Sequence, residues 1–106
     1  MTKQQIIAKV AEVLGFSVDE LLTKGRKTDV VYARYITMSI LRVEGFSDND
    51  IADVFTQWTL NNIANHCREV FDSLISYNRK FKDMYLKAAK AVEDLDDEIQ
   101  NEKKSA

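Results

Sequence analysis

Apolar residues recur along this chain at spacings of three and four, and no proline interrupts them. That spacing puts apolar side chains on one face of an α-helix, whereas a half-buried strand would show a period of two. The 106 residues, 45% of them apolar, are enough for a single core. We therefore expect an all-α fold, a compact bundle of five to six helices. The first helical stripe consists of Ile6, Ile7, Val10, Val13 and Leu14.

Local signals mark where these helices begin and end. Gly15 and Gly45 are predicted to end the first and third helices, because glycine readily adopts the left-handed conformation found just past a helix. A serine followed three residues later by an acidic residue forms a capping box. This pattern predicts short helices opened by Ser17 and Ser47. Thr28 is expected to cap the long third helix, which would lie at the centre of the core.

Residues 47–74 have the pattern of a helix-turn-helix. Residues 56–58 interrupt the apolar spacing that follows Ser47, and Thr59 is predicted to cap a fifth helix. Two helices joined by a turn of three or four residues form a helix-turn-helix. By itself the motif is a weak indication of DNA binding, since such pairs also occur as ordinary packing units. We expect Trp58, in the turn, to pack over the helix pair. The inward face of the fifth helix carries Ile63, Cys67, Val70, Phe71 and Leu74.

The sequence divides into a helix-turn-helix unit, residues 1–76, and a C-terminal helical extension with an acidic tail, residues 77–106. Two interpretations of the extension remain open. It either packs on the body at first and then frays into solvent, or its stripe forms the seam of a homodimer. The stripe consists of Phe81, Met84, Tyr85, Ala88, Val92, Leu95 and Ile99.

The net charge of −2 does not indicate a polyanionic partner, but the charge is unevenly distributed along the chain. Residues 1–90 contain 13 Lys and Arg against 11 Asp and Glu, whereas residues 91–106 contain 2 against 6. A local basic loop can contact phosphates even on a nearly neutral protein. The stretch 23–27 is such a loop, and we expect it to be exposed. Its cations, with one on the next helix, are Lys24, Arg26, Lys27 and Arg34.

Nothing in the sequence favours catalysis. There is no glycine-rich phosphate loop, and the single Cys67 and single His66 cannot assemble a zinc site or a triad. We therefore expect no enzymatic activity, cofactor, metal or bound nucleotide. The chain has no long apolar run and no export signal, so a cytoplasmic protein without a membrane span is expected. Cys67 reads as buried packing on its helix, and His66 as an exposed side chain.

The segment VAEVLGFSVDELLTKGRKTDVVYARYITMSIL, residues 10–41, resembles the C-terminal DNA-binding domain of the bacterial replication initiator DnaA. It contains the S-x-x-(E/D)-L-L phrase, a K-x-R loop and an A-R pair on a long helix. The resemblance continues through residues 46–55 and resumes at Cys67 and Arg68. In this family the loop arginine enters the minor groove. The resemblance therefore implies that role for Arg26, with Lys24, Lys27 and Arg34 near the DNA backbone.

The recognition helix departs from the family. Where the family carries G-G-R-D-H-(S/T)-T-V-x-H-A, this chain reads TQWTLNNIANH, residues 56–66. The family's base-reading side chains are replaced, and asparagines occupy three of five positions from residue 61 to 65. Because asparagine can pair bidentately with adenine in the major groove, these residues predict a preference for A·T-containing sites; the alternative is plain polar surface. The predicted DNA contacts are Lys24, Arg26, Lys27, Arg34, Thr59, Asn61, Asn62, Asn65 and Arg68.

Two functions follow from these observations. The first is a double-stranded DNA-binding protein that acts in replication or transcription regulation, with the basic loop on phosphates and the minor groove and the recognition helix in the major groove. The alternative is a protein-interaction module that kept the fold and lost specific DNA binding, which the net charge and the rewritten signature favour.

Overall fold

The computed structural model describes residues 1–105, and every element within this range is a helix. The all-α prediction is thus confirmed. A short π-helical segment, η1, directly precedes α5. None of the described helices is long and apolar enough to cross a membrane. The elements are α1 (Lys3–Leu14), α2 (Val18–Leu22), α3 (Thr28–Val43), α4 (Asp48–Val54), η1 (Asn62–His66), α5 (Cys67–Tyr77) and α6 (Arg79–Ser105).

The predicted helix boundaries follow from local chemistry. Both expected capping boxes form, with the hydroxyls of Ser17 and Ser47 each accepting from the backbone N–H three residues on. Gly15 and Gly45 adopt φ of 83° and 98°, as the left-handed ends of α1 and α3 require. The expected cap at Thr28 is wrong by one residue. Thr28 is the first residue of α3, whose N-cap, Lys27, makes no side-chain capping bond.

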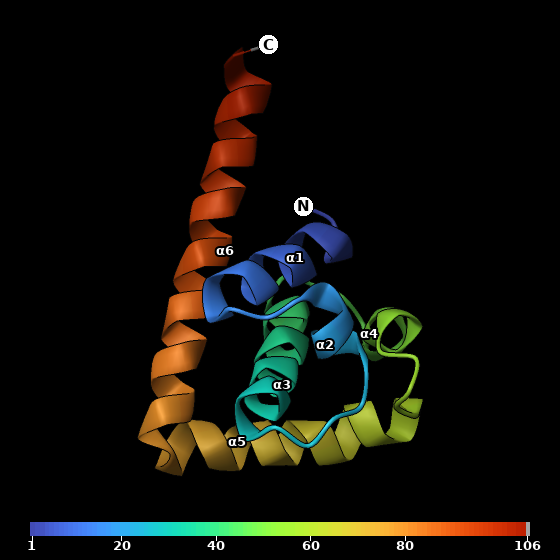
Figure 1. Ribbon diagram of the computed structural model, residues 1–106. Helices are drawn as coiled ribbons and strands as arrows, with labels where there is room; N and C mark the ends of the chain where they lie inside the picture. The colour runs from blue at the N-terminus through green and yellow to red at the C-terminus, as the bar shows by residue number, and fades with distance from the viewer. Residues whose placement is uncertain (106) are drawn as a thin grey trace.

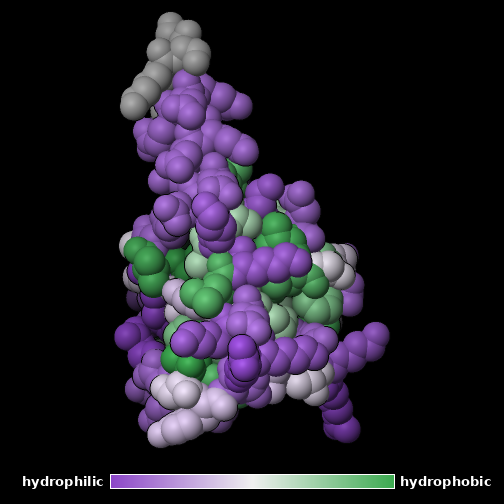
Figure 2. Space-filling view, turned by 90° about the vertical axis from the view of Figure 1, so that its left-hand side faces the viewer, coloured by the Kyte–Doolittle hydropathy of each residue, from purple (hydrophilic) through white to green (hydrophobic). Residues whose placement is uncertain are grey.

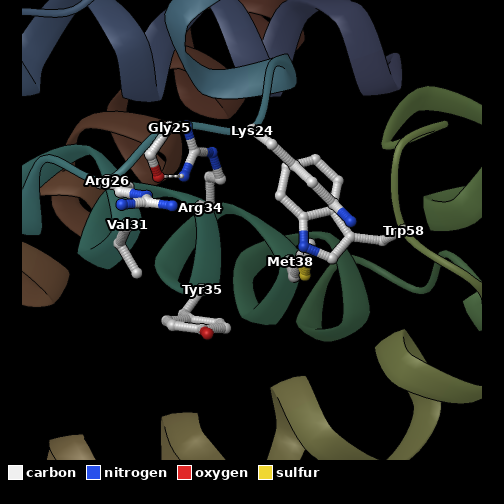
Figure 3. A pocket seen from close by; sticks show the side chains of 8 residues that line it. All are labelled: Lys24, Gly25, Arg26, Val31, Arg34, Tyr35, Met38 and Trp58. Atoms are coloured by element: carbon white, nitrogen blue, oxygen red, sulfur yellow. Dashed lines mark hydrogen bonds between the residues drawn. The ribbon is translucent and has the colours of Figure 1, made fainter.

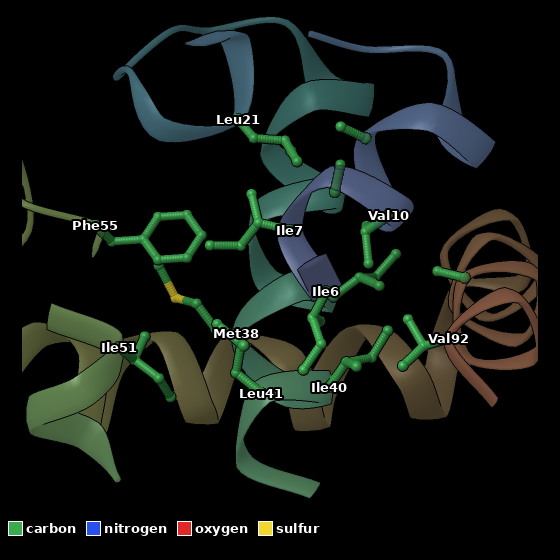
Figure 4. Close-up of a cluster of buried hydrophobic side chains, with 14 of the residues drawn as sticks. Ile6, Ile7, Val10, Leu21, Met38, Ile40, Leu41, Ile51, Phe55 and Val92 are labelled. Carbon is green, nitrogen blue, oxygen red and sulfur yellow. The ribbon is translucent and has the colours of Figure 1, made fainter. Parts of the chain in front are cut away.

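Helix α3 is the centre of the bundle. Helices α1 and α2 lie over one side of it, α5 crosses the other side, and α6 runs along the edge of the assembly (Figure 1). The side chains that meet between α1, α3 and the helix-turn-helix are buried and aliphatic, with Phe55 as the aromatic member at the α4 side (Figure 4). Each fully buried aliphatic or aromatic side chain contributes about 1.5–3 kcal/mol relative to exposure. The fold is therefore held by a core that reaches across sequence-distant helices.

Helix α6 has two halves with different surroundings. Its first half packs on α1, α3 and α5 through Phe81, Ala88 and Val92, which are 0%, 0% and 1% exposed. Phe81 makes edge contacts with Tyr32 and Phe71, at 5.3 and 5.5 Å between ring centroids. The second half projects past the body and is helical through Ser105 (Figure 1). Much of the stripe considered as a dimer seam is therefore covered by this chain's own core.

Candidate nucleic-acid interface

The helix-turn-helix comprises α4, a turn and the helix that begins at Leu60 and continues as η1 and α5. The predicted cap of this helix is present, because Asn62 N–H donates to Thr59 Oγ1 at 3.1 Å. Trp58 packs edge-on against the buried Phe55, with 5.7 Å between ring centroids. This is the covering role expected for the tryptophan. The turn is thereby anchored to the core before the recognition helix starts.

The basic loop, residues 23–27, is attached to this turn. Lys24 N–H donates to Gln57 Oε1 at 2.8 Å, and Lys24 Nζ lies 5.7 Å from the centre of the Trp58 ring. A cation over an indole face is attracted by the ring quadrupole. Lys24, Arg26 and Lys27 are exposed, as predicted. The loop that carries the cations and the turn that starts the recognition helix are therefore neighbours in space, although more than 30 residues separate Lys24 from Gln57.

Arg34, which was expected near the DNA backbone, is buried. It is 4% exposed, and its guanidinium donates to the carbonyls of Leu21, Gly25 and Glu20 at 3.0, 3.1 and 3.1 Å. A further bond reaches the Thr23 carbonyl. Its Cζ also lies 5.4 Å from the centre of the Trp58 ring. Burial lowers the pKa of Arg34 from its usual value. A buried guanidinium that bonds four carbonyls holds the loop in shape, and it is poorly placed for the phosphate contact expected of it.

A groove of 360 Å³ lies between the loop, α3 and the turn (Figure 3). Its walls combine the cations Lys24, Arg26 and Arg34 with the aromatic rings of Tyr35 and Trp58. In Figure 3 the Arg34 guanidinium points at the loop, while Lys24 extends along the Trp58 ring. Burial raises the pKa of the Tyr35 hydroxyl above its ordinary value, at which this group is already neutral at physiological pH. The groove wall therefore contributes positive charge without a facing carboxylate in its lining.

The recognition helix contains a π-helical change of register that no pattern in residues 56–66 predicts. Cys67 N–H bonds the carbonyl of Asn62, five residues back, rather than that of Ile63. Arg42 of α3 donates to the Ile63 carbonyl at 2.5 Å instead. A side chain that inserts into the helical ladder is a known cause of such a break. The same arginine pairs with Asp48 at 3.0 Å, and Asp48 also contacts Arg68 at 3.4 Å.

Two of the three asparagines form a pair on the exposed face. Asn65 Nδ2 donates to Asn61 Oδ1 at 2.8 Å and to the Asn61 carbonyl at 3.1 Å. Both residues are exposed, whereas Asn62 is half-buried and accepts a bond from Cys67 Sγ at 3.3 Å. Of the three asparagines expected to contact bases, only Asn61 and Asn65 are exposed. Asn62 faces the protein rather than solvent, so it is poorly placed for the base contact expected of it.

Cys67 and His66 are the two residues of this interface that could take part in metal or thiol chemistry. Cys67 is 2% exposed, and burial raises the pKa of its thiol. His66 is exposed. Among the described residues there is no group of three or more His, Cys, Asp or Glu side chains that could hold a metal ion. The side chains gathered here are cations, amides and aromatic rings, which are groups of the kind that contact nucleic acids.

The model of the bacterial DnaA protein helix-turn-helix family matches residues 3–70, which is more than half of the chain. The chain belongs to this family. The DnaA helix-turn-helix family binds double-stranded DNA and is not a catalytic family. A comparison with curated proteins found no match. The matched residues include the basic loop, the turn and the start of the recognition helix. They end within α5, so α6 lies outside the matched region.

Proposed function

We propose that this DnaA-family chain is a double-stranded DNA-binding module that acts in replication or transcription regulation. One observation supports it above the others: the basic loop is attached through Gln57 and Trp58 to the start of the recognition helix. A helix-turn-helix reads the major groove with the N-terminal residues of its second helix. With the loop attached at that end, Arg26 can enter the adjacent minor groove while Lys24 and Lys27 contact phosphates.

The asparagine pair supports a base preference. The bond from Asn65 to Asn61 leaves Asn65 Oδ1 as an acceptor and Asn61 Nδ2 as a donor. Adenine presents the complementary groups in the major groove, a donor at N6 and an acceptor at N7. The two side chains together can therefore read one adenine. Thr59 and Arg68 flank this pair at the helix start and one turn beyond it, where phosphate contacts are expected.

The test is a titration of labelled random duplex with the full chain at rising salt, followed by fluorescence anisotropy. Each phosphate contact contributes about −0.9 to the slope of log affinity against log salt. The double substitution Arg26→Ala with Lys27→Ala should make that slope less negative by about 2. It should also weaken binding at least tenfold at about 0.1 M salt. The matched control removes two exposed cations elsewhere, Lys87→Ala with Lys90→Ala, and should behave like the unmodified chain.

Base reading is tested on sites selected from random duplex. The unmodified chain should enrich A·T-containing sites, and Asn61→Ala with Asn65→Ala should abolish that enrichment while leaving the salt slope unchanged. Binding that is absent at every salt concentration would contradict DNA binding and favour the interaction module. Enrichment that survives the double substitution would contradict the role of the asparagine pair alone.

A further inference from the structure

A patch of basic and aromatic side chains lies where α5 turns into α6. We call Tyr77, Arg79, Lys80 and Lys82 the corner patch. All four are exposed, and Tyr77 is 89% exposed, which is unusual for an aromatic ring on a folded protein. The patch lies outside the residues matched by the family. An exposed tyrosine beside three cations offers hydroxyl, ammonium and guanidinium donors, the groups that commonly contact phosphate oxygens.

The corner patch is attached to the same end of α3 as the basic loop. Lys80 Nζ lies 2.7 Å from Asp29 Oδ1, in the first turn of α3, two residues after Lys27 of the loop. Asn78, between the two helices, donates to the Tyr32 hydroxyl at 3.0 Å and accepts from Phe81 N–H at 2.9 Å. The position of the corner relative to the loop is therefore fixed by contacts on two sides.

The charges at the corner favour an anion. Lys80 neutralises Asp29, the acidic residue of the first turn of α3. Arg79 and Lys82 make no ion pair within the described residues. They line a hollow of 470 Å³ together with Tyr77, and Asp83 is the one carboxylate in that lining. The balance of charge in the hollow is therefore positive.

Charge is also separated along α6 as a whole. Residues 79–92 include five cations and one acidic residue, whereas residues 93–105 include six acidic residues and two cations. The positive end is the one next to the basic loop, and the acidic end projects away from the body. Figure 2 faces α6 and shows hydrophilic side chains along the projecting half. In the field of a polyanion this separation orients the molecule with the corner toward it.

We propose that the corner patch binds the phosphodiester backbone of the duplex, as a second anchor beyond the basic loop. The inference rests on the proposed function. Arginine forks and tyrosine hydroxyls are among the common donors to phosphate oxygens. The helix from residue 60 to 77 is roughly 27 Å long, less than the 34 Å of one duplex turn, so the recognition helix and the corner can contact one duplex.

The experiment compares Arg79→Ala with Lys82→Ala against the control Lys87→Ala with Lys90→Ala, two turns further along the same helix. Lys80 is left in place because it pairs with Asp29. Each variant of the full chain is titrated with labelled duplexes of about 12 and about 30 base pairs, the longer one spanning nearly three turns. On the longer duplex the corner variant should lose about 2 from the salt slope and about tenfold in affinity.

The same loss should appear on the shorter duplex, because its roughly 41 Å, at 3.4 Å per base pair, exceeds the roughly 27 Å between the start of the recognition helix and the corner. Circular dichroism and thermal unfolding should not change, since both substituted residues are exposed. An unchanged salt slope on the long duplex overturns the second anchor. An equal loss in the control variant also overturns it, because the effect would then be that of charge alone.

The loop variant, Arg26→Ala with Lys27→Ala, separates this inference from the proposed function. If the unmodified chain binds no DNA, both fall. If the loop variant loses affinity and the corner variant does not, the proposed function stands and only the corner is overturned.

Discussion

At the scale of single residues, Arg34 holds the basic loop in shape, a role that its position in the sequence does not indicate. Its guanidinium bonds the carbonyls of the α2 end and the basic loop. A planar fork with five donors suits several fixed acceptors at once, which an ammonium group with three rotating donors does not. No carboxylate pairs with it among the described ion pairs. Position 34 therefore requires the donor geometry of a guanidinium more than it requires a positive charge.

Arg34→Lys tests that distinction, because it keeps the charge and removes the fork. Charged hydrogen bonds contribute about 1.5–3 kcal/mol each, and water can replace some of them at the exposed loop. We expect the free energy of unfolding in urea to fall by about 2 kcal/mol and DNA affinity to fall with it. Arg26→Lys, on the exposed part of the loop, should leave unfolding unchanged. A lysine at position 34 that preserves both properties would contradict the positioning role.

The exposed position of the loop cations and the caps at Ser17, Ser47 and Thr59 could be predicted, because both depend on residues within three or four positions. The burial of Arg34 could not, because a lone arginine among aliphatic residues has the same local pattern whether its head group reaches solvent or backbone. Only the fold brings four carbonyls to it. The bond between Asn61 and Asn65 is an i to i+4 contact, and the sequence did place these two residues on one helix face.

At the scale of elements, the positions of the helices along the chain could be predicted, but the contacts between helices could not. Glycines and capping boxes fixed most boundaries, since these signals are local. The π register of η1 depends on Arg42, which reaches from α3 to the Ile63 carbonyl. It therefore has no signature within the helix itself. Likewise, the apolar stripe of α6 predicted a buried face, but whether this chain or a second copy covers it depends on where α6 packs.

The first half of α6 is expected to be essential to the core although the family match ends before it. Phe81→Ala should lower the free energy of unfolding by about 3–5 kcal/mol, because a fully buried ring that contacts Tyr32 and Phe71 would leave a cavity. Leu86→Ala, on the same helix but 53% exposed, is the control and should change it by less than about 0.5 kcal/mol. Equal, small effects in urea titrations would mean that residues 77–106 are an independent extension.

At the scale of the whole molecule, net charge is a poor guide to what this chain binds. The value of −2 is the sum of a body with a small basic excess and an acidic helical end. The sequence revealed this imbalance, but it could not show that the basic start of α6 lies beside the basic loop. That proximity comes from the contact between Lys80 and Asp29. The molecule is elongated, with a longest extent of 43 Å, so its charges act on a ligand from different distances.

The acidic end should therefore influence DNA binding only through long-range repulsion. Substituting Glu93, Glu98 and Glu102 by Gln and Asp97 by Asn changes the net charge from −2 to +2 while keeping helix-compatible side chains. The screening length is about 30 Å at 0.01 M salt and about 8 Å at 0.15 M. Affinity for random duplex should thus rise severalfold at the lower salt and less than about twofold at the higher. A gain that persisted undiminished at 0.15 M would show that the acidic end reaches the DNA-binding face directly.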